Sequence, residues 1–269
     1  MPIHPTAVID PQARLDASVE IGPYVVIEGP VQIGAGTYIA PHVHILGHTT
    51  IGDACRIHSG AVIGDWPQDR NYTGAETYCR IGNGTLLREH VTIHRGTQPG
   101  TETVIGDRCM LLAHSHVAHN CRLGDDILLV NGALLAGHVT VGNRAVISGN
   151  AAVHQFSRVG DLAMIGGLAK ITRDIPPYLM FDGAGVCVGV NIVGLRRAGF
   201  SREERQDVKA VYKALYRTPG SFSRALAEVE GLVSTPAGKK LLEFLKAPSK
   251  RGIQAGRRGD ADGNESDDE

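Results

Sequence analysis

Aliphatic residues recur at every sixth position over most of the chain. Stepping by six from Ile3 meets an aliphatic residue at every position up to Ile63. The same phase returns for three positions from Ile81 and then runs from Ile105 to Ile171. In the first of these blocks, a small or β-branched residue stands four places after each aliphatic one. A period of six fits neither the 3.6-residue stripe of an α-helix nor a plain alternating strand, so it predicts short strands that turn corners.

Three such steps make a triangular coil of 18 residues. The inward aliphatic residues would stack along the axis, and each strand would pair with the next coil at roughly 4.8 Å. This pattern resembles the hexapeptide-repeat proteins. The resemblance supplies the left-handed sense, which spacing alone does not determine. We therefore expect an all-β left-handed parallel β-helix with a small C-terminal α-helical domain.

Two interruptions of the repeat preserve its phase. Ile63 and Ile81 are 18 residues apart, and Ile93 and Ile105 are 12 apart. Both gaps can therefore be loops, over residues 64–80 and 96–104, that project from a continuing prism. Loops on a rigid repeat scaffold are frequent carriers of function.

The pattern changes to a helical period beyond Ile171. Ser201 and Glu204 form a capping box that starts a helix, and Thr218-Pro219-Gly220 ends it. Two further amphipathic helices are marked by Leu226, Val229 and Leu232, and by Leu241, Leu242, Phe244 and Leu245. The expected domains are a catalytic β-helix over 1–190, a helical domain over 191–246 and a disordered acidic tail over 247–269.

Composition narrows the function classes. Glycine contributes 34 of 269 residues and aromatic residues only 5%, which favours a repetitive, glycine-punctuated fold. The formal charge of −1 lacks the basic excess that nucleic-acid binding requires. No apolar run is long enough to be a transmembrane segment, and the first residues lack a signal-peptide pattern, so a cytoplasmic location is expected. The five cysteines show no CxxC spacing and are expected to be reduced thiols.

The histidines are confined to the repeat region. All twelve lie at or before residue 154. Among those that follow the first interruption, five are candidates for chemistry, namely His94, His116, His119, His138 and His154. His119 and His138 are 19 residues apart, one coil plus one residue, so adjacent coils would bring them to the same edge.

Several segments together resemble the bacterial UDP-N-acetylglucosamine acyltransferases, over the chain as far as about residue 246. These segments are Pro67-Gln68-Asp69, Val91-Thr92-Ile93-His94-Arg95-Gly96-Thr97, His116-Val117-Ala118-His119-Asn120-Cys121, Leu135-Ala136-Gly137-His138, Val153-His154-Gln155-Phe156, Gly189-Val190-Asn191-Ile192 and Gly194-Leu195-Arg196-Arg197. Hexapeptide repeats alone are shared with many acetyltransferases, whereas this series of segments is specific.

The resemblance implies transfer of a 3-hydroxyacyl group from acyl carrier protein to the glucosamine 3-hydroxyl of UDP-N-acetylglucosamine, the first step of lipid A synthesis. It implies a homotrimer with sites between subunits, and a reaction without metal or cofactor. His119 matches the general base and Gly137 the donor of an oxyanion-binding N–H, while Asn120 would orient the imidazole. A sugar hydroxyl is too weak an acid to attack a thioester unaided, and imidazole titrates near working pH.

Further residues match substrate contacts of that family. The substrate-binding set is Gln68, Asp69, His94, His116, His138, His154, Gln155, Asn191 and Arg197. Gly167 matches the position that limits acyl length, and glycine there would admit a long chain.

Four positions depart from the family pattern. Asn120 stands where an Asp is usual, Asn71 replaces a Lys, Val193 replaces a Glu and Ala198 replaces an Arg. These departures affect nucleotide recognition most. They leave open a 3-amino sugar nucleotide as the acceptor.

Other readings also remain open. The related N-acyltransferase normally carries an N-terminal uridine-binding domain, whereas the repeats here begin at Ile3. A γ-carbonic-anhydrase-like zinc enzyme could use His94, His116 and His119 as ligands. A non-catalytic trimeric scaffold is a third alternative. The basic residues from Arg196 to Lys209 suit either an acidic carrier protein or an ordinary solvated helix start.

Overall fold

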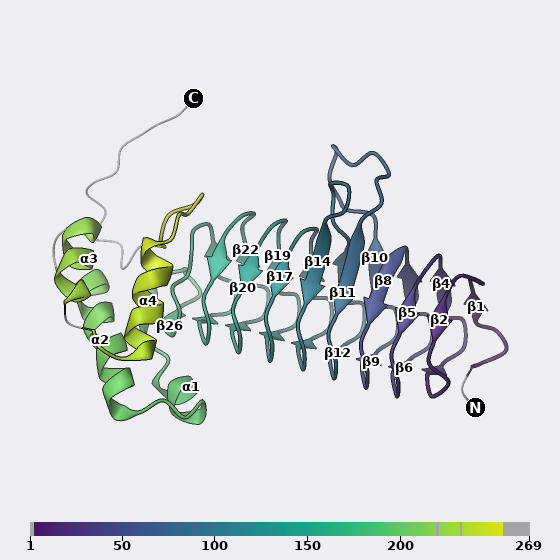
Figure 1. Cartoon of the computed structure of the whole chain (residues 1–269), viewed down its shortest axis with the longest axis horizontal. Helices are drawn as coiled ribbons and strands as arrows, with labels where there is room; N and C mark the ends of the chain where they lie inside the picture. Colours follow the sequence, from purple (N-terminus) through teal and green to yellow (C-terminus); the bar gives the residue numbers. More distant parts are fainter. Residues whose placement is uncertain (1–2, 219–220, 232, 255–269) are drawn as a thin grey trace.

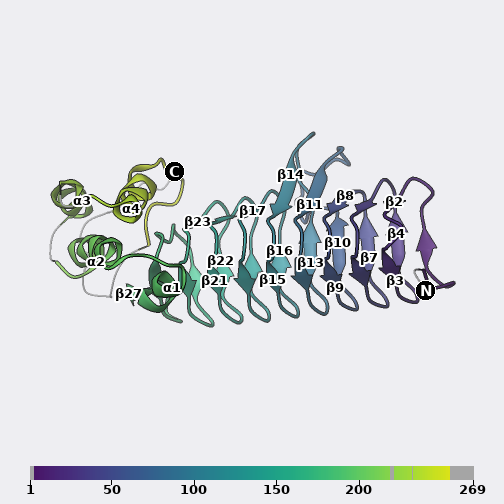
Figure 2. The ribbon, with the colours of Figure 1, turned by 60° about the horizontal axis from the view of Figure 1, so that its bottom comes forward.

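The computed structural model describes residues 3–218, 221–231 and 233–254. A row of short coils runs from the N-terminus to a cluster of helices at the opposite end, as Figures 1 and 2 show. Paired residues of successive coils are 18 apart where no loop intervenes, as in Val8 and Val26. The prediction of an 18-residue coil is confirmed.

The strands form three sheets, one on each side of the prism, in which all but the last strand pair are parallel. Sheet 1 contains β1 (Val8–Ile9), β4 (Val26–Glu28), β7 (His44–Leu46), β10 (Val62–Asp65), β13 (Thr92–His94), β16 (His116–Val117), β19 (Leu134–Leu135), β22 (Ala152–Val153) and β25 (Lys170–Ile171). Sheet 2 contains β2 (Arg14–Leu15), β5 (Gln32–Ile33), β8 (His48–Ile51), β11 (Tyr78–Ile81), β14 (Glu102–Ile105), β17 (Arg122–Leu123), β20 (Thr140–Val141) and β23 (Arg158–Val159). Sheet 3 contains β3 (Glu20–Ile21), β6 (Tyr38–Ile39), β9 (Arg56–Ile57), β12 (Leu86–Leu87), β15 (Met110–Leu111), β18 (Leu128–Leu129), β21 (Val146–Ile147), β24 (Met164–Ile165), β26 (Leu179–Phe181) and β27 (Cys187–Val190).

The core is the axial stack of the sixth-position aliphatic residues. From Ile21 onward the residues of this series are buried, whereas Ile3 in the first coil is 44% exposed because no preceding coil covers it. The small or β-branched residues predicted to point inward, such as Val25 and Ala61, are buried as well. All five cysteines are buried free thiols.

Both interruptions of the repeat are loops between strands of sheets 1 and 2. Val62 pairs with Thr92, and Thr92 pairs with His116, so each coil closes in register despite its insertion. The loops project from one edge of the prism near β10, β11 and β14 (Figure 1). They are shorter than the predicted ranges because the flanking strands extend, leaving 66–77 and 95–101 outside the strands.

The helical region follows the last strand. It comprises α1 (Ile192–Arg197), α2 (Arg202–Tyr216), α3 (Phe222–Glu230) and α4 (Pro236–Lys246). The capping box of Ser201 and Glu204 is present at α2, as predicted. The short helix α1 is an addition to the prediction, and Leu232 lies outside the described residues. No helix in the described ranges is long and apolar enough to span a membrane.

Arg158 of β23 links the end of the prism to α4. Arg158 donates from its backbone N–H and from Nε to the fully buried carboxylate of Asp174, each at 2.7 Å. The Arg158 guanidinium also lies 4.5 Å from the centroid of the Phe244 ring in α4.

Residues 247–254, which we name the C-terminal strap, differ from the expected disordered tail. The strap returns to the prism, where Asp174 N–H donates to Gly252 O and Gln254 N–H donates to Asp174 O, both at 2.8 Å. Backbone pairing, which is insensitive to composition, therefore orders this polar segment. Residues 255–269 of the predicted tail lie outside the described residues.

Candidate active site

A groove-like cavity of about 460 Å³ follows the outer face of sheet 1 to the corner where sheets 1 and 2 meet. It is lined by Gln68, His116, Ala118, His119, Leu134, Leu135, Ala136, Gly137, Ala152, Val153, His154, Gln155, Lys170, Ile171 and Thr172. Strand register explains its length, because His116, Leu134, Ala152 and Lys170 are paired neighbours on successive coils. The cavity therefore joins an apolar floor to a histidine-bearing corner.

The His119 side chain is buried at this corner, and a hydrogen bond with Asn120 fixes one of its two ring nitrogens. Its Nδ1 lies 3.0 Å from Asn120 Oδ1, which also accepts the Thr97 backbone N–H at 3.2 Å and the Thr97 hydroxyl at 2.9 Å. A backbone N–H can only donate, so the Asn120 atom at this position must be the oxygen. In the neutral ring, Nδ1 of His119 then carries the proton and Nε2 carries the lone pair.

Gly137 lies directly against the His119 ring. A Cβ atom added at Gly137 would lie 2.4 Å from His119 Cε1 and 2.6 Å from Nε2, so only glycine fits there. The N–H groups of Ala136 and His138 donate to the carbonyls of Val153 and His119. The Gly137 N–H donates to no other described residue. Gly137 therefore offers an N–H that has no described partner beside the His119 ring.

Two histidines near His119 are kept neutral by their surroundings. Burial, reinforced by His94 and His119, lowers the pKa of His116 to about 4, and its Nδ1 lies 2.7 Å from Thr92 Oγ1. Burial also lowers the pKa of His94, against the opposing effect of Asp65. The His94 and His116 rings meet edge to face at 4.9 Å. These side chains offer polar contacts without positive charge.

An aromatic column extends from His119 toward the C-terminal end of the prism. His138 meets His119 edge to face at 5.3 Å, and Phe156 stacks on His138 at 4.8 Å. Both His138 and Phe156 adopt positive φ at this corner. Burial, with His119 and Lys250 nearby, lowers the pKa of His138, while Asp69 acts in the opposite direction. Asp69 of the first loop therefore lies within electrostatic reach of the same corner.

Most of the residues predicted from the sequence converge here. Gln68, His116, His119, Gly137, His154 and Gln155 line one cavity. Asn120, His94 and His138 contact its histidines directly. The His154 Nδ1 is held by Gln155 O at 3.1 Å.

Three predicted residues lie away from this corner within a single chain. Gly167 lies at the corner between sheets 3 and 1, beside Gly149 O. Asn191 uses its side chain internally, because Oδ1 accepts the Gly194 N–H at the start of α1 and Nδ2 donates to Leu162 O. Arg197 is in the last turn of α1.

Sequence reasoning missed the contribution of three residues. Thr97 anchors Asn120, although it was noted only as part of a family segment. Leu134 and Lys170 line the cavity because they occupy outward positions on β19 and β25. The signal for both was available, since the residue before each inward aliphatic points outward from the same sheet.

The described residues contain no group of three or more His, Cys, Asp or Glu side chains arranged to hold a metal ion. His94, His116 and His119 are therefore not arranged as a zinc site. Their arrangement gives no support to the carbonic-anhydrase alternative.

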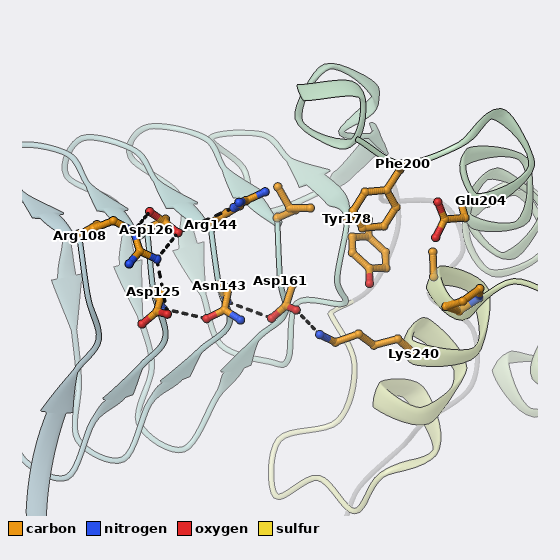
Figure 3. A pocket seen from close by; sticks show the side chains of 13 residues that line it. Arg108, Asp125, Asp126, Asn143, Arg144, Asp161, Tyr178, Phe200, Glu204 and Lys240 are labelled. Atoms are coloured by element: carbon orange, nitrogen blue, oxygen red, sulfur yellow. Dashed lines mark hydrogen bonds and ion pairs between the residues drawn. The ribbon is translucent and has the colours of Figure 1, made fainter. Parts of the chain in front are cut away.

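A second cavity, of about 460 Å³, lies between the prism and the helical region and contains none of the predicted site residues (Figure 3). Asp125, Asn143 and Asp161 form a ladder along its wall, in which each side-chain oxygen accepts the backbone N–H one coil earlier. Lys240 of α4 is paired with Asp161 at the end of this ladder. This cavity is a polar joint between the two parts of the chain.

Two family models match the chain. The first, for domain 2 of UDP-N-acetylglucosamine O-acyltransferase, covers residues 174–254. The second, for six bacterial transferase hexapeptide repeats, covers residues 30–65.

Individual proteins match over nearly the whole chain. An acyl-[acyl-carrier-protein]–UDP-N-acetylglucosamine O-acyltransferase from Sinorhizobium fredii is 41% identical, covering 96% of each chain. The protein of the same name from Halorhodospira halophila is 51% identical, covering 80% of this chain and 84% of its own. The crystal structure of the Francisella novicida UDP-N-acetylglucosamine acyltransferase aligns with a TM-score of 0.90 at 36% identity, covering 96% of this chain and 95% of its own.

Proposed function

The chain belongs to the acyl-[acyl-carrier-protein]–UDP-N-acetylglucosamine O-acyltransferases, and on that premise we propose that it transfers a 3-hydroxyacyl group with His119 as the general base. The acyl donor is acyl carrier protein and the acceptor is UDP-N-acetylglucosamine, in the first step of lipid A biosynthesis. The acceptor atom in this proposal is the glucosamine 3-hydroxyl oxygen.

His119 Nε2 removes the proton from the sugar hydroxyl as its oxygen attacks the thioester carbon. The held Nδ1 makes this possible, because a neutral imidazole protonated at Nδ1 has its lone pair on Nε2. Asn120 fixes the ring without adding charge. The proton taken up by His119 leaves an imidazolium beside the developing oxyanion.

Collapse of the tetrahedral intermediate completes the transfer. The free N–H of Gly137 is in place to donate to the oxyanion, and glycine permits the approach. The carbon–sulfur bond then breaks, and His119 returns its proton to the departing thiolate. The products are the 3-O-acyl sugar nucleotide and the carrier with a free thiol, which balances the reaction.

The single observation that carries this proposal is the contact between the His119 ring, with Nδ1 held, and the Gly137 backbone inside the cavity. The neutral His116 and His94 fit a supporting role. Uncharged imidazoles can hydrogen-bond substrate hydroxyl and amide groups without raising the cost of forming the His119 imidazolium.

The substrate-binding roles of Gln68, Asp69, His138, His154 and Gln155 belong to the same proposal. The positions of these residues support these roles. Gln68, His154 and Gln155 line the cavity, and His138 contacts His119. Asp69 faces His138 from the first loop. Gly167, Asn191 and Arg197 would have to reach the site of a neighbouring copy.

We therefore propose that the protein is a homotrimer with its sites between subunits. An apolar line on the outside of sheet 3 supports this, formed by Met110, Leu128, Val146 and Met164 on successive coils. Met110 is 44% exposed and Met164 39%. Exposed apolar surface of this continuity is typical of protein interfaces.

The proposal also covers the length of the transferred acyl chain and the cellular location of the reaction. Gly167 has only Gly149 O close to the position of a Cβ, at 3.3 Å, which leaves room for a long acyl chain. We place the reaction in the cytoplasm, because acyl carrier protein and nucleotide sugars are cytoplasmic molecules.

Mass spectrometry of the product tests the function. The purified protein is incubated with a ladder of 3-hydroxyacyl carrier proteins and with UDP-N-acetylglucosamine or its 3-amino analogue. We expect a 3-O-acyl product from UDP-N-acetylglucosamine, with a long chain preferred. If product forms only with the 3-amino analogue, the acceptor is the amino sugar nucleotide. If folded protein forms no product with either sugar, the proposed function is wrong.

A further inference from the structure

The C-terminal strap borders the far end of the active-site cavity. Arg251 Nε donates to the carbonyl of Thr172 at 3.1 Å, and Thr172 is part of the cavity wall. Ser249 Oγ accepts the N–H groups of Arg251 and Gly252 at 3.0 and 2.7 Å. Together with the backbone bonds to Asp174, these contacts fix the strap against the last coil.

Lys250 of the strap completes the aromatic column that begins at His119. Its ammonium lies 4.4 Å from the centroid of the Phe156 ring, which is itself stacked on His138. The Lys250 side chain is exposed and forms no ion pair with a carboxylate in the described part of the chain. A positive charge is thus held in place by an aromatic face, with its hydrogen-bonding capacity unused.

Other basic residues surround this point. Lys170 lines the end of the cavity, Arg173 Nη1 approaches Gly252, and Arg251 belongs to the strap itself. None of these cations is paired with a described Asp or Glu side chain. The far end of the cavity is therefore an anion-attracting region, and no predicted substrate contact accounts for it.

The distance from His119 to Lys250 along the prism indicates which substrate phosphate could reach Lys250 while the reacting atom lies at His119. Coils are spaced by about 4.8 Å, so Lys250, three steps along the column from His119, lies roughly 14 Å from the base. In the carrier's phosphopantetheine arm, about thirteen bonds separate sulfur from phosphorus, a reach of roughly 16 Å at about 1.2 Å per bond of an extended chain. In the sugar nucleotide, about five bonds separate the 3-oxygen from the nearer phosphorus, a reach of roughly 6 Å. Of these two phosphates, only the one on the carrier's phosphopantetheine arm matches the distance from His119 to Lys250.

We propose that Lys250 binds the phosphodiester of the carrier's phosphopantetheine arm. The inference rests on the proposed function and adds a donor-binding residue to it. The arm would run from the thioester at His119 past Phe156 to the strap, and the ammonium would form a charge-assisted hydrogen bond to a phosphate oxygen. Arg251 and Arg173 would strengthen the local positive potential.

Steady-state kinetics with three donors test the proposal. The donors are 3-hydroxyacyl carrier protein, 3-hydroxyacyl phosphopantetheine and 3-hydroxyacyl pantetheine, which lacks the phosphate. For Lys250→Gln we expect KM for both phosphate-bearing donors to rise about tenfold, with kcat little changed. The KM values for acyl pantetheine and for UDP-N-acetylglucosamine should stay within about twofold of wild type, and Lys250→Arg should restore the donor KM.

Lys239→Gln is the matched control, since Lys239 is an exposed lysine of α4 that makes no ion pair with a described residue. The proposal is wrong if Lys250→Gln leaves the KM for phosphate-bearing donors unchanged. It is also wrong if acyl pantetheine suffers equally, which would indicate a packing role through Phe156, or if only the KM for UDP-N-acetylglucosamine rises. Failure of the wild-type protein to use any donor would instead overturn the proposed function.

Discussion

The amide oxygen of Asn120 accepts hydrogen bonds from Thr97 twice and from His119 once. It fixes the ring of the base but supplies no charge to the imidazolium formed during the reaction. A carboxylate at this position would accept the same donors and add attraction to the imidazolium, as Asp does in catalytic triads.

Asn120→Asp is therefore expected to raise kcat by about tenfold, whereas Asn120→Ala should lower it by about a hundredfold because the ring loses its anchor. Initial rates with saturating substrates measure both. Asn150→Asp is a matched control, since Asn150 has the same positive φ at another corner. A lower kcat for Asn120→Asp than for wild type would contradict this role.

The depressed pKa of His116 makes folding stability depend on pH. The folded-state pKa of about 4 lies below the value of 6.5 expected in the unfolded chain. The unfolded state therefore binds the proton first as pH falls. The contribution of the neutral ring is complete above about pH 6.5 and is lost as pH falls toward 4.

Urea unfolding between pH 7 and 4 tests this effect. We expect wild type to lose about 2 kcal/mol more of its unfolding free energy over this range than His116→Asn, which does not titrate there. Parallel pH dependences for the two proteins would show that His116 is not held neutral.

At the scale of single residues, the resemblance named most of the residues that the structure brings together at the cavity, including His119, Gly137 and Gln68. It did not reveal the Thr97 contact, because Thr97 lies in a projecting loop and its distance to Asn120 depends on how that loop folds back. The position of Lys250 against Phe156 was not predicted either, since Lys250 falls in a segment whose composition suggested disorder.

Short elements were predictable where the repeat controls them. The two-residue strands and their corners follow from the six-residue period, and the capping box located α2. Helix α1 was not predicted because its six residues contain Gly194 and too few positions to show a helical period. Its stability comes partly from the Asn191 cap.

The joint between prism and helices includes an ion pair with a buried carboxylate. Asp174 is fully buried and accepts two hydrogen bonds from Arg158. Asp174→Asn should cost about 3 kcal/mol of unfolding free energy, because the Arg158 guanidinium, whose side chain is only 22% exposed, loses its charged partner. Lys240→Ala, which removes a more exposed pair with Asp161, should cost less than about 1 kcal/mol. Equal losses in thermal or urea unfolding would contradict this ranking.

The whole molecule was largely predictable because its core repeats. One period, read from Ile3 to Ile171, set the coil size and the inward residues, and both loops preserved register. The handedness and the assembly came only from the family resemblance. The six-residue spacing does not determine the handedness. It does not determine the assembly either, because assembly depends on the outward-pointing residues, whose identity the period does not constrain.

The proposed trimer predicts the effect of a charge on sheet 3. Met110→Glu places a carboxylate in the apolar line and should dissociate a particle of three times the 28.6 kDa chain mass. Activity should fall together with the mass, because the proposal places the sites between subunits. Thr140→Glu, on the outer face of sheet 2, should change neither quantity. Light scattering coupled to size exclusion measures the mass, and a fully active wild-type monomer would refute the assembly.

The central claim is that His119 is the base for acyl transfer in the cavity at the corner of sheets 1 and 2. The most direct measurement is kcat for His119→Ala with 3-hydroxyacyl carrier protein and UDP-N-acetylglucosamine, beside His44→Ala as a histidine control elsewhere on sheet 1. We predict a loss of about a thousandfold for His119→Ala and near wild-type kcat for His44→Ala. A folded His119→Ala protein that retains a tenth or more of wild-type kcat would contradict the account.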